Sequence, residues 1–176
     1  MPDANKTYLP LKIRPLTADK LGKISALHSK SVAATKESTR LEAEAVRMAQ
    51  LEVGAQMDDG SIYAGISPDT NERMYAVPAD IEGDFNQAAK RAQELSQESG
   101  KVYRVPSEAE MEVLYSNCTA IGGFKETGIA ENNDWYWSST EYEGDTINLA
   151  KGMLFYDGRT TTLPKTCVYS VRLVRS

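Results

Sequence analysis

An Asp-Gly pair near the end of the sequence, Asp157-Gly158, constrains the fold most strongly. It stands between two strand-like runs, 149–156, which ends in Phe155 and Tyr156, and 159–163, which contains three threonines. An Asp-Gly pair readily adopts the left-handed backbone of a tight hairpin turn, so these runs predict an antiparallel pair of strands. The chain then closes with residues 167–174, in which apolar residues alternate with mixed ones, as in a final strand with one wholly apolar face.

Helix-start signals come before these strands. Asp84 and Gln87 form a D-x-x-Q capping box, and Ser107 and Glu110 form an S-x-x-E capping box. The expected elements are a hairpin (61–66 and 73–77), a helix ending at Gly100, a short strand (102–105), a second helix, a long loop (122–134) and strands at 135–139, 149–156, 159–163 and 167–174. This order predicts an α+β domain in which two helices flank antiparallel sheets.

The first 55 residues follow a different pattern. Residues 7–16 alternate as in a strand, but two prolines restrict them to a sheet edge or an extended arm. Residues recurring every seven positions then suggest a weak coiled coil: Leu27, Ala34, Leu41 and Met48. Two amphipathic helices that break in the polar stretch 29–40 fit the same residues. We therefore divide the chain into an extended segment with a helical arm for assembly or attachment (1–55) and a domain (56–176).

The net charge of -5 is unevenly distributed. Residues 1–55 carry nine basic and six acidic side chains, whereas residues 56–176 carry eleven basic and nineteen acidic ones. An acidic domain repels phosphate and sulfate groups before contact, so nucleic acid is not an expected partner.

Two cysteines and one histidine limit the chemistry available. A structural zinc site with four nitrogen or sulfur ligands is not expected from so few. His28 lies in the polar helical arm, away from any plausible nucleophile, which disfavours a Ser-His-Asp hydrolase. Cys118 and Cys167 could pair, but we favour two separate, partly buried thiols.

Membrane insertion is not expected, because no apolar run approaches the ~20 residues needed to cross a bilayer. The first fifteen residues also lack the basic-then-apolar layout of a secretory signal. This predicts a mature chain, or a protein that is cytoplasmic, virion-associated or exported by a route that needs no such signal.

Four segments resemble a known domain in order and spacing: YRVPS at 103–107, WYWSSTEY at 135–142, FYDG at 155–158 and VRLVR at 171–175. With the hairpin IYAGISPDT…MYA, they are similar to a bacterial domain of the C-type-lectin-like superfamily that closes collagen-like adhesins. The resemblance covers about residues 58–176. It implies a C-type-lectin-like fold with paired terminal strands and a loop-rich face for ligands, and it implies that Arg172 and Arg175 pair with carboxylates.

The resemblance implies binding rather than catalysis. Formylglycine-generating and sulfatase-modifying enzymes belong to the same superfamily, but their active sites use a cysteine pair that Cys118 and Cys167 do not match. We therefore expect a non-catalytic module that binds a glycan or a protein, such as a bacterial or phage adhesin or an effector that engages a host. An enzyme of the sulfatase-modifying type and a scaffold acting through its helical arm are the alternatives. The relatives on fibrous adhesins are trimers, and the heptad of the arm is compatible with a trimer.

The predicted binding face combines two loops: Asn132, Asn133, Asp134, Glu141, Tyr142, Glu143 and Asp145. Loops on a rigid scaffold often carry function, and Tyr142 could stack on a sugar. Trp135 and Trp137 share one side of a strand and are assigned to the core. No cofactor is expected. Calcium at the acidic loop 131–134 is the alternative, although the E-P-N, Q-P-D and W-N-D motifs of calcium-dependent lectins do not occur.

Overall fold

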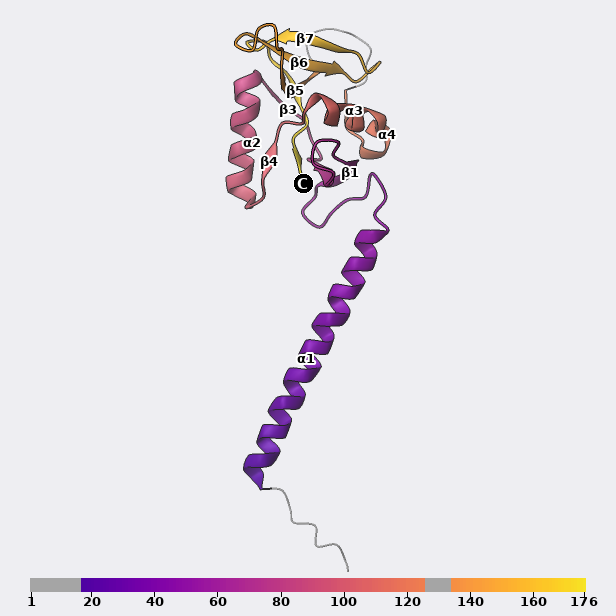
Figure 1. The fold of residues 1–176 in the computed structure, drawn as a ribbon, viewed down its shortest axis with the longest axis vertical. Helices are drawn as coiled ribbons and strands as arrows, with labels where there is room; N and C mark the ends of the chain where they lie inside the picture. Colours follow the sequence, from indigo (N-terminus) through magenta and orange to yellow (C-terminus); the bar gives the residue numbers. More distant parts are fainter. Residues whose placement is uncertain (1–16, 126–133) are drawn as a thin grey trace, which may run out of the picture. The chain divides into compact units, whose positions relative to one another are not determined.

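The computed structural model describes residues 17–125 and 134–176 (Figure 1). The chain divides into two units, of which the first ends at Gln50 and the second spans Leu51–Ser176. Our sequence-based boundary lay five residues later. The structure places it earlier because residues after Gln50 are already bonded into the second unit: the Gly54 N–H donates to the Tyr63 carbonyl (2.8 Å), and the Tyr63 N–H donates to the Ala55 carbonyl (2.9 Å). The predicted strand at 7–16 lies outside the described residues.

The first unit contains one continuous helix, α1 (Ala18–Ala49). The alternative of two helices with a break between residues 29 and 40 is therefore wrong. The polar residues of this stretch fit the helix because their hydroxyls donate to carbonyls one turn back. Ser29 donates to the Ser25 carbonyl (3.0 Å) and Thr35 to the Ser31 carbonyl (2.9 Å).

The second unit contains two sheets, which confirms a mixed α+β fold. The first has the order β1 (Ile62–Ile66), β2 (Arg73–Ala76), β9 (Val174–Arg175), β4 (Tyr103–Arg104), and the second has the order β3 (Ile81–Gly83), β8 (Tyr169–Val171), β5 (Trp135–Glu141), β6 (Leu149–Leu154), β7 (Thr160–Pro164). The expectation of purely antiparallel pairing fails at one place, because β5 and β8 run parallel.

Both predicted capping boxes form. Asp84 accepts from the Gln87 N–H (2.8 Å) and Gln87 accepts from the Asp84 N–H (3.0 Å) at the start of α2 (Phe85–Ser99). Ser107 and Glu110 do the same for α3 (Glu108–Ser116). Gly100 ends α2 in a left-handed conformation, as its position predicted. The short helix α4 (Cys118–Ile121) was not predicted.

The last strand differs from the prediction. Residues 167–174 form two short strands in different sheets, with β8 in the second sheet and β9 in the first. The chain crosses between the sheets at Arg172 and Leu173, both buried. The crossing is stabilised there because the Leu173 carbonyl accepts from the Val77 N–H (3.0 Å).

Two hydrophobic cores lie on opposite faces of β5. Tyr136 packs in the core that also receives α3, whereas Trp137 packs in the core that also receives α2. Figure 1 shows the same division, with α2 on one side of the strands and α3 and α4 on the other. Trp137 is fully buried and Trp135 packs against the same core, which confirms their assignment.

Candidate functional site

The loop between β5 and β6, residues 142–148, has a defined conformation. Asp145 accepts hydrogen bonds from the backbone N–H of Asn148 (3.1 Å) and from its side-chain amide (3.0 Å). The Leu149 N–H donates to the Asp145 carbonyl (3.0 Å). The bonds from Asn148 hold the pKa of the Asp145 carboxyl below its ordinary value, so this carboxylate is charged at neutral pH. The loop is therefore an ordered platform.

Lys165 connects this loop to α2. Its ammonium group forms an ion pair with Glu141 and donates to the Thr146 carbonyl (2.7 Å). The same group lies 4.4 Å from the centre of the Phe85 ring. The backbone adds a further connection, because the Phe85 N–H donates to the Lys165 carbonyl (3.2 Å). A shift of the 142–148 loop would therefore disturb the first turn of α2.

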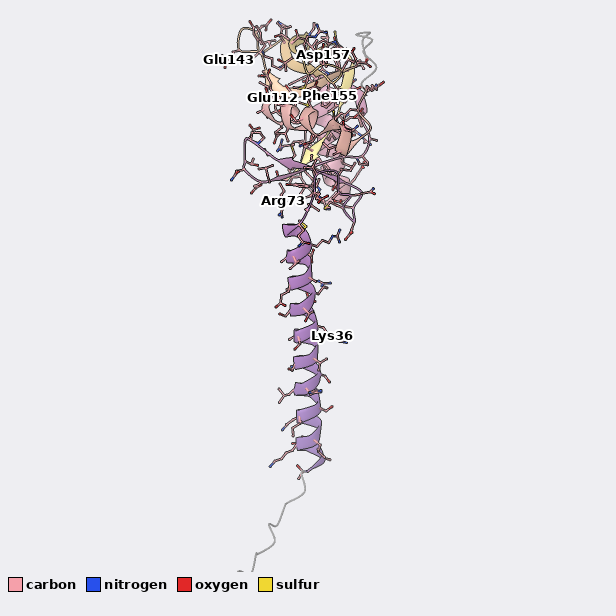
Figure 2. The ribbon with its side chains drawn as sticks, turned by 90° about the vertical axis from the view of Figure 1, so that its right-hand side faces the viewer. Lys36, Arg73, Glu112, Glu143, Phe155 and Asp157 are labelled. Atoms are coloured by element: carbon pink, nitrogen blue, oxygen red, sulfur yellow. The ribbon has the colours of Figure 1, made fainter. Side chains whose placement is uncertain are left out.

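Tyr142 is the exposed aromatic residue of the loop, with 39% of its surface accessible. Its ring lies against Gly144, where an added Cβ would come within 2.6 Å of the ring. The Lys151 ammonium lies 5.7 Å from the ring centre. In the same loop Ile147 is 83% exposed, and Figure 2 shows Glu143 at the periphery of the unit. The loop thus presents an aromatic ring, an aliphatic side chain and a carboxylate together.

The structure places part of the predicted binding face in this loop. Glu141, Tyr142, Glu143 and Asp145 lie together at one end of β5, and Glu141 and Asp145 have partners there. Asp134 precedes the other end of the seven-residue strand, ~20 Å away at the usual rise. It is buried, with 6% of its surface exposed. Asn132 and Asn133 lie outside the described residues.

A groove lies between α2 and β4, and sequence reasoning missed it. Its volume is about 480 Å³, and it is lined by Phe85, Ala89, Ala92, Gln93, Ser96, Tyr103, Arg104, Val105 and Ser139. Most of this lining is aromatic or aliphatic. The signal in the sequence was the alanines of α2, which leave open the space that larger side chains would fill.

We call this feature the α2–β4 groove, and two of its lining residues connect it to the 142–148 loop. Ser139 lines the groove and lies on β5 two residues before Glu141, which leads into the loop. Phe85 lines the groove and contacts Lys165, which holds the loop. The groove and the loop are therefore joined through β5 and through the contact of Phe85 with Lys165.

A buried carboxylate neutralises the cation at the wall of the groove. Arg104 lines the groove, and both its terminal nitrogens donate to Glu110, one of them at 2.6 Å from Oε1. Ser67 also donates to Oε1 (2.5 Å). Burial by itself raises the pKa of Glu110, but the hydrogen bonds from Arg104 and Ser67 outweigh it and leave the pKa below its ordinary value. The wall therefore carries a compensated ion pair.

Cys118 and Cys167 are not joined by a disulfide and both are partly buried, which confirms the prediction of two separate thiols. Within residues 17–125 and 134–176, no cluster of three or more histidine, cysteine, aspartate or glutamate side chains could hold a metal ion. Most of the loop 131–134 lies outside this range, so calcium binding there stays a prediction.

Among the helices that the structure describes, none combines the length and apolar character needed to cross a membrane. No model of a known protein family matches the sequence, and no curated protein gives a significant match. The assignment of a function therefore rests on the residues and geometry of the groove and the loop.

Proposed function

We propose that residues 51–176 form a non-catalytic recognition domain with a C-type-lectin-like fold, which binds a protein or glycan ligand. The observation that carries this proposal is the α2–β4 groove of about 480 Å³ beside an ordered loop that exposes Tyr142. An apolar cavity of this size with a few polar groups at its margin is the usual form of a ligand site.

Strand pairing supports the C-type-lectin-like assignment. The last strand, β9, pairs with β2 of the entry hairpin and with β4, which follows α2. The resemblance in sequence implies this kind of closure, in which the two ends of the domain meet in one sheet. Arg172 and Arg175 also form ion pairs with Asp80 and Asp59, as the resemblance implies.

The chemistry of the groove favours a protein segment over a glycan. Sugars offer hydroxyl groups that need hydrogen-bond partners, whereas the groove offers mainly aromatic and aliphatic surface. A peptide could place one apolar side chain in the groove and rest a neighbouring residue against Tyr142 and Ile147. Because Glu143 belongs to the same loop and the domain is acidic, a basic residue next to the apolar anchor would be favoured.

The engagement of nearby charged groups supports binding rather than catalysis. Glu110 is bonded to Arg104, Glu141 is paired with Lys165, and Asp145 is bonded to Asn148. A general acid or base must be able to reach and exchange a proton with a substrate, and these carboxylates instead hold the structure in place.

A paired screen tests the proposal. Full-length protein would be panned against a random peptide display library and applied to a glycan array, with calcium and with chelator. We expect peptides with an apolar residue near a basic one. Ala89→Trp, which fills the groove from the exposed side of α2, should abolish their binding, whereas Gln97→Trp on the same helix outside the groove should not.

Other outcomes have defined meanings. A glycan hit that tolerates Ala89→Trp but is lost in Tyr142→Ala would replace the peptide with a sugar on the loop. Loss of that hit under chelator would support the calcium prediction. Failure of both screens would contradict the proposed recognition function.

A further inference from the structure

Helix α1 carries an exposed seam with heptad spacing. The seam consists of Ile24, Leu27, Ser31, Ala34, Ser38, Leu41 and Ala45, all of which are exposed. Its large members are well exposed to solvent, with Ile24 53%, Leu27 67% and Leu41 54% accessible. Most helical stability in proteins comes from packing of an apolar face, so a 32-residue helix with this seam is suited to a partner.

Charges beside the seam are segregated along the helix. Every second seam residue is directly preceded in the sequence by a charged residue. These charged residues are seven positions apart: Lys23, Lys30, Glu37 and Glu44. The two lysines lie in the first half of α1 and the two glutamates in the second half. In helix pairs, residues at such flanking positions determine which orientation of the partner is favoured.

These charges complement each other only when two copies of α1 run in opposite directions. Lys23 then faces Glu44 of the partner subunit, and Lys30 faces Glu37 of the partner subunit. The seam residues that face each other in this register are centred between Val32 and Ala33, one residue from the midpoint of Ala18–Ala49, so the two helices overlap over nearly their whole length. In a parallel pair, Glu37 would instead face Glu42 of the partner subunit and be repelled.

We propose that α1 is a self-association surface that pairs with α1 of a second copy of this chain in antiparallel orientation. In this register Ile24 faces Leu41 of the partner subunit at both ends of the overlap. Ser31 faces Ala34 of the partner subunit in the middle, where small side chains let the two backbones approach closely. This inference is independent of the ligand site in the second unit.

Existing contacts within α1 do not oppose the pairing. Lys23 lies 3.1 Å from Asp19, and Glu37 lies 3.0 Å from Arg40, in both cases as exposed ion pairs within one helix. Such exposed pairs contribute little to stability, and a lysine ammonium can donate to two carboxylates at once.

Analytical ultracentrifugation of the full-length chain, at low and at high salt, tests the proposal. We expect a dimer that weakens as salt rises. Lys30→Glu and Glu37→Lys each turn two attractive contacts into repulsive ones, and each should raise the dimer dissociation constant about tenfold or more. The double variant K30E/E37K, and an equal mixture of the two single variants, should restore the dimer because opposite charges again face each other.

The control is Lys36→Glu, which makes the same charge change as Lys30→Glu at a position off the seam (Figure 2) and should leave the dimer unchanged. Circular dichroism would establish that each variant keeps its helix. A monomer at all concentrations, a trimer, or a dimer that Glu37→Lys strengthens would each overturn the proposal, the last because it is the result expected of a parallel pair.

Discussion

Arg172 and Asp80 form an ion pair in the interior of the second unit, with 2.5 Å between Arg172 Nε and Asp80 Oδ1. Arg172 is fully buried and also donates to the carbonyls of Gly122 (3.1 Å) and Gly123 (2.7 Å). Tyr136 donates to the other oxygen of Asp80 (2.5 Å). Burial, together with this bond to Asp80, raises the pKa of the Tyr136 hydroxyl above its ordinary value. The cluster joins the turn after β2, the end of α4 and the crossing between β8 and β9.

Removing the guanidinium should strongly destabilise the protein. Arg172→Met leaves Asp80 without its cation in a largely buried position, which typically costs about 3–5 kcal/mol of unfolding free energy. Denaturant titration of the full-length chain would measure it. Arg159→Met is the control, because its ion pair with Asp157 is exposed and should contribute under ~1 kcal/mol. The double variant R172M/D80L should recover part of the lost stability. If Arg172→Met lost less stability than Arg159→Met, the role assigned to Arg172 would be contradicted.

Glu110 should make stability depend on pH in the acid range. Its folded-state pKa is lowered from the ordinary value of 4.5. The resulting stabilisation is therefore fully present above the unfolded pKa, and it is lost as pH falls through the folded pKa. Glu110→Gln should cost about 1–3 kcal/mol at pH 7 and should flatten the acid side of the stability curve. Unfolding free energies measured across the acid range would show this.

Glu112→Gln, an exposed position on the same helix (Figure 2), is the control for Glu110→Gln and should leave the pH dependence nearly unchanged. An equal flattening by both substitutions would mean that the general charge of the helix, and not the buried Arg104–Glu110 pair, sets the acid sensitivity.

Alanine substitutions at two glycines with left-handed backbones allow the cost of backbone strain to be measured separately from the cost of a steric clash. At Gly60 (φ +83°) no atom lies within 4 Å of the position that a Cβ would take, whereas at Gly158 (φ +73°) a Cβ would lie 2.5 Å from the Tyr115 ring. Gly60→Ala should cost about 1 kcal/mol from backbone strain alone. Gly158→Ala should cost more, by the free energy needed to move Tyr115. Equal losses in thermal unfolding would show that the Tyr115 ring yields freely.

Gly144→Ala should displace Tyr142 without unfolding the domain. A Cβ at this position would lie 2.6 Å from the Tyr142 ring, and the ring is exposed enough to rotate away. We expect a change in unfolding free energy under ~1 kcal/mol, as for most surface substitutions. Affinity for a peptide or glycan selected in the screen should fall as in Tyr142→Ala. Retained affinity in Gly144→Ala but not in Tyr142→Ala would mean that the ring position in the free protein is not needed for binding.

Local chemistry made much of the fold predictable from the sequence. The capping boxes at Asp84 and Ser107 depend on contacts three residues apart, and the hairpin at Gly158 depends on the backbone freedom of one residue. The two-residue period of a strand placed Trp135 and Trp137 on one side, and the resemblance to the lectin-like domain suggested that Trp137 fills the core, where it is buried. The four predicted loop residues from Glu141 to Asp145 do lie together because they are adjacent in the chain.

Tertiary structure decided the rest, because those features depend on residues far apart in sequence. The last strand divides between two sheets at Arg172, whose side chain pairs with Asp80, ninety-two residues earlier. The α2–β4 groove is formed where alanines of α2 face β4 and Ser139. The spacing of residues along the sequence does not predict that these three segments come together. By itself the sequence determined which local elements form and which faces they bury. Which elements pack against each other depends on contacts between residues far apart in the chain, and only the tertiary structure determines those contacts.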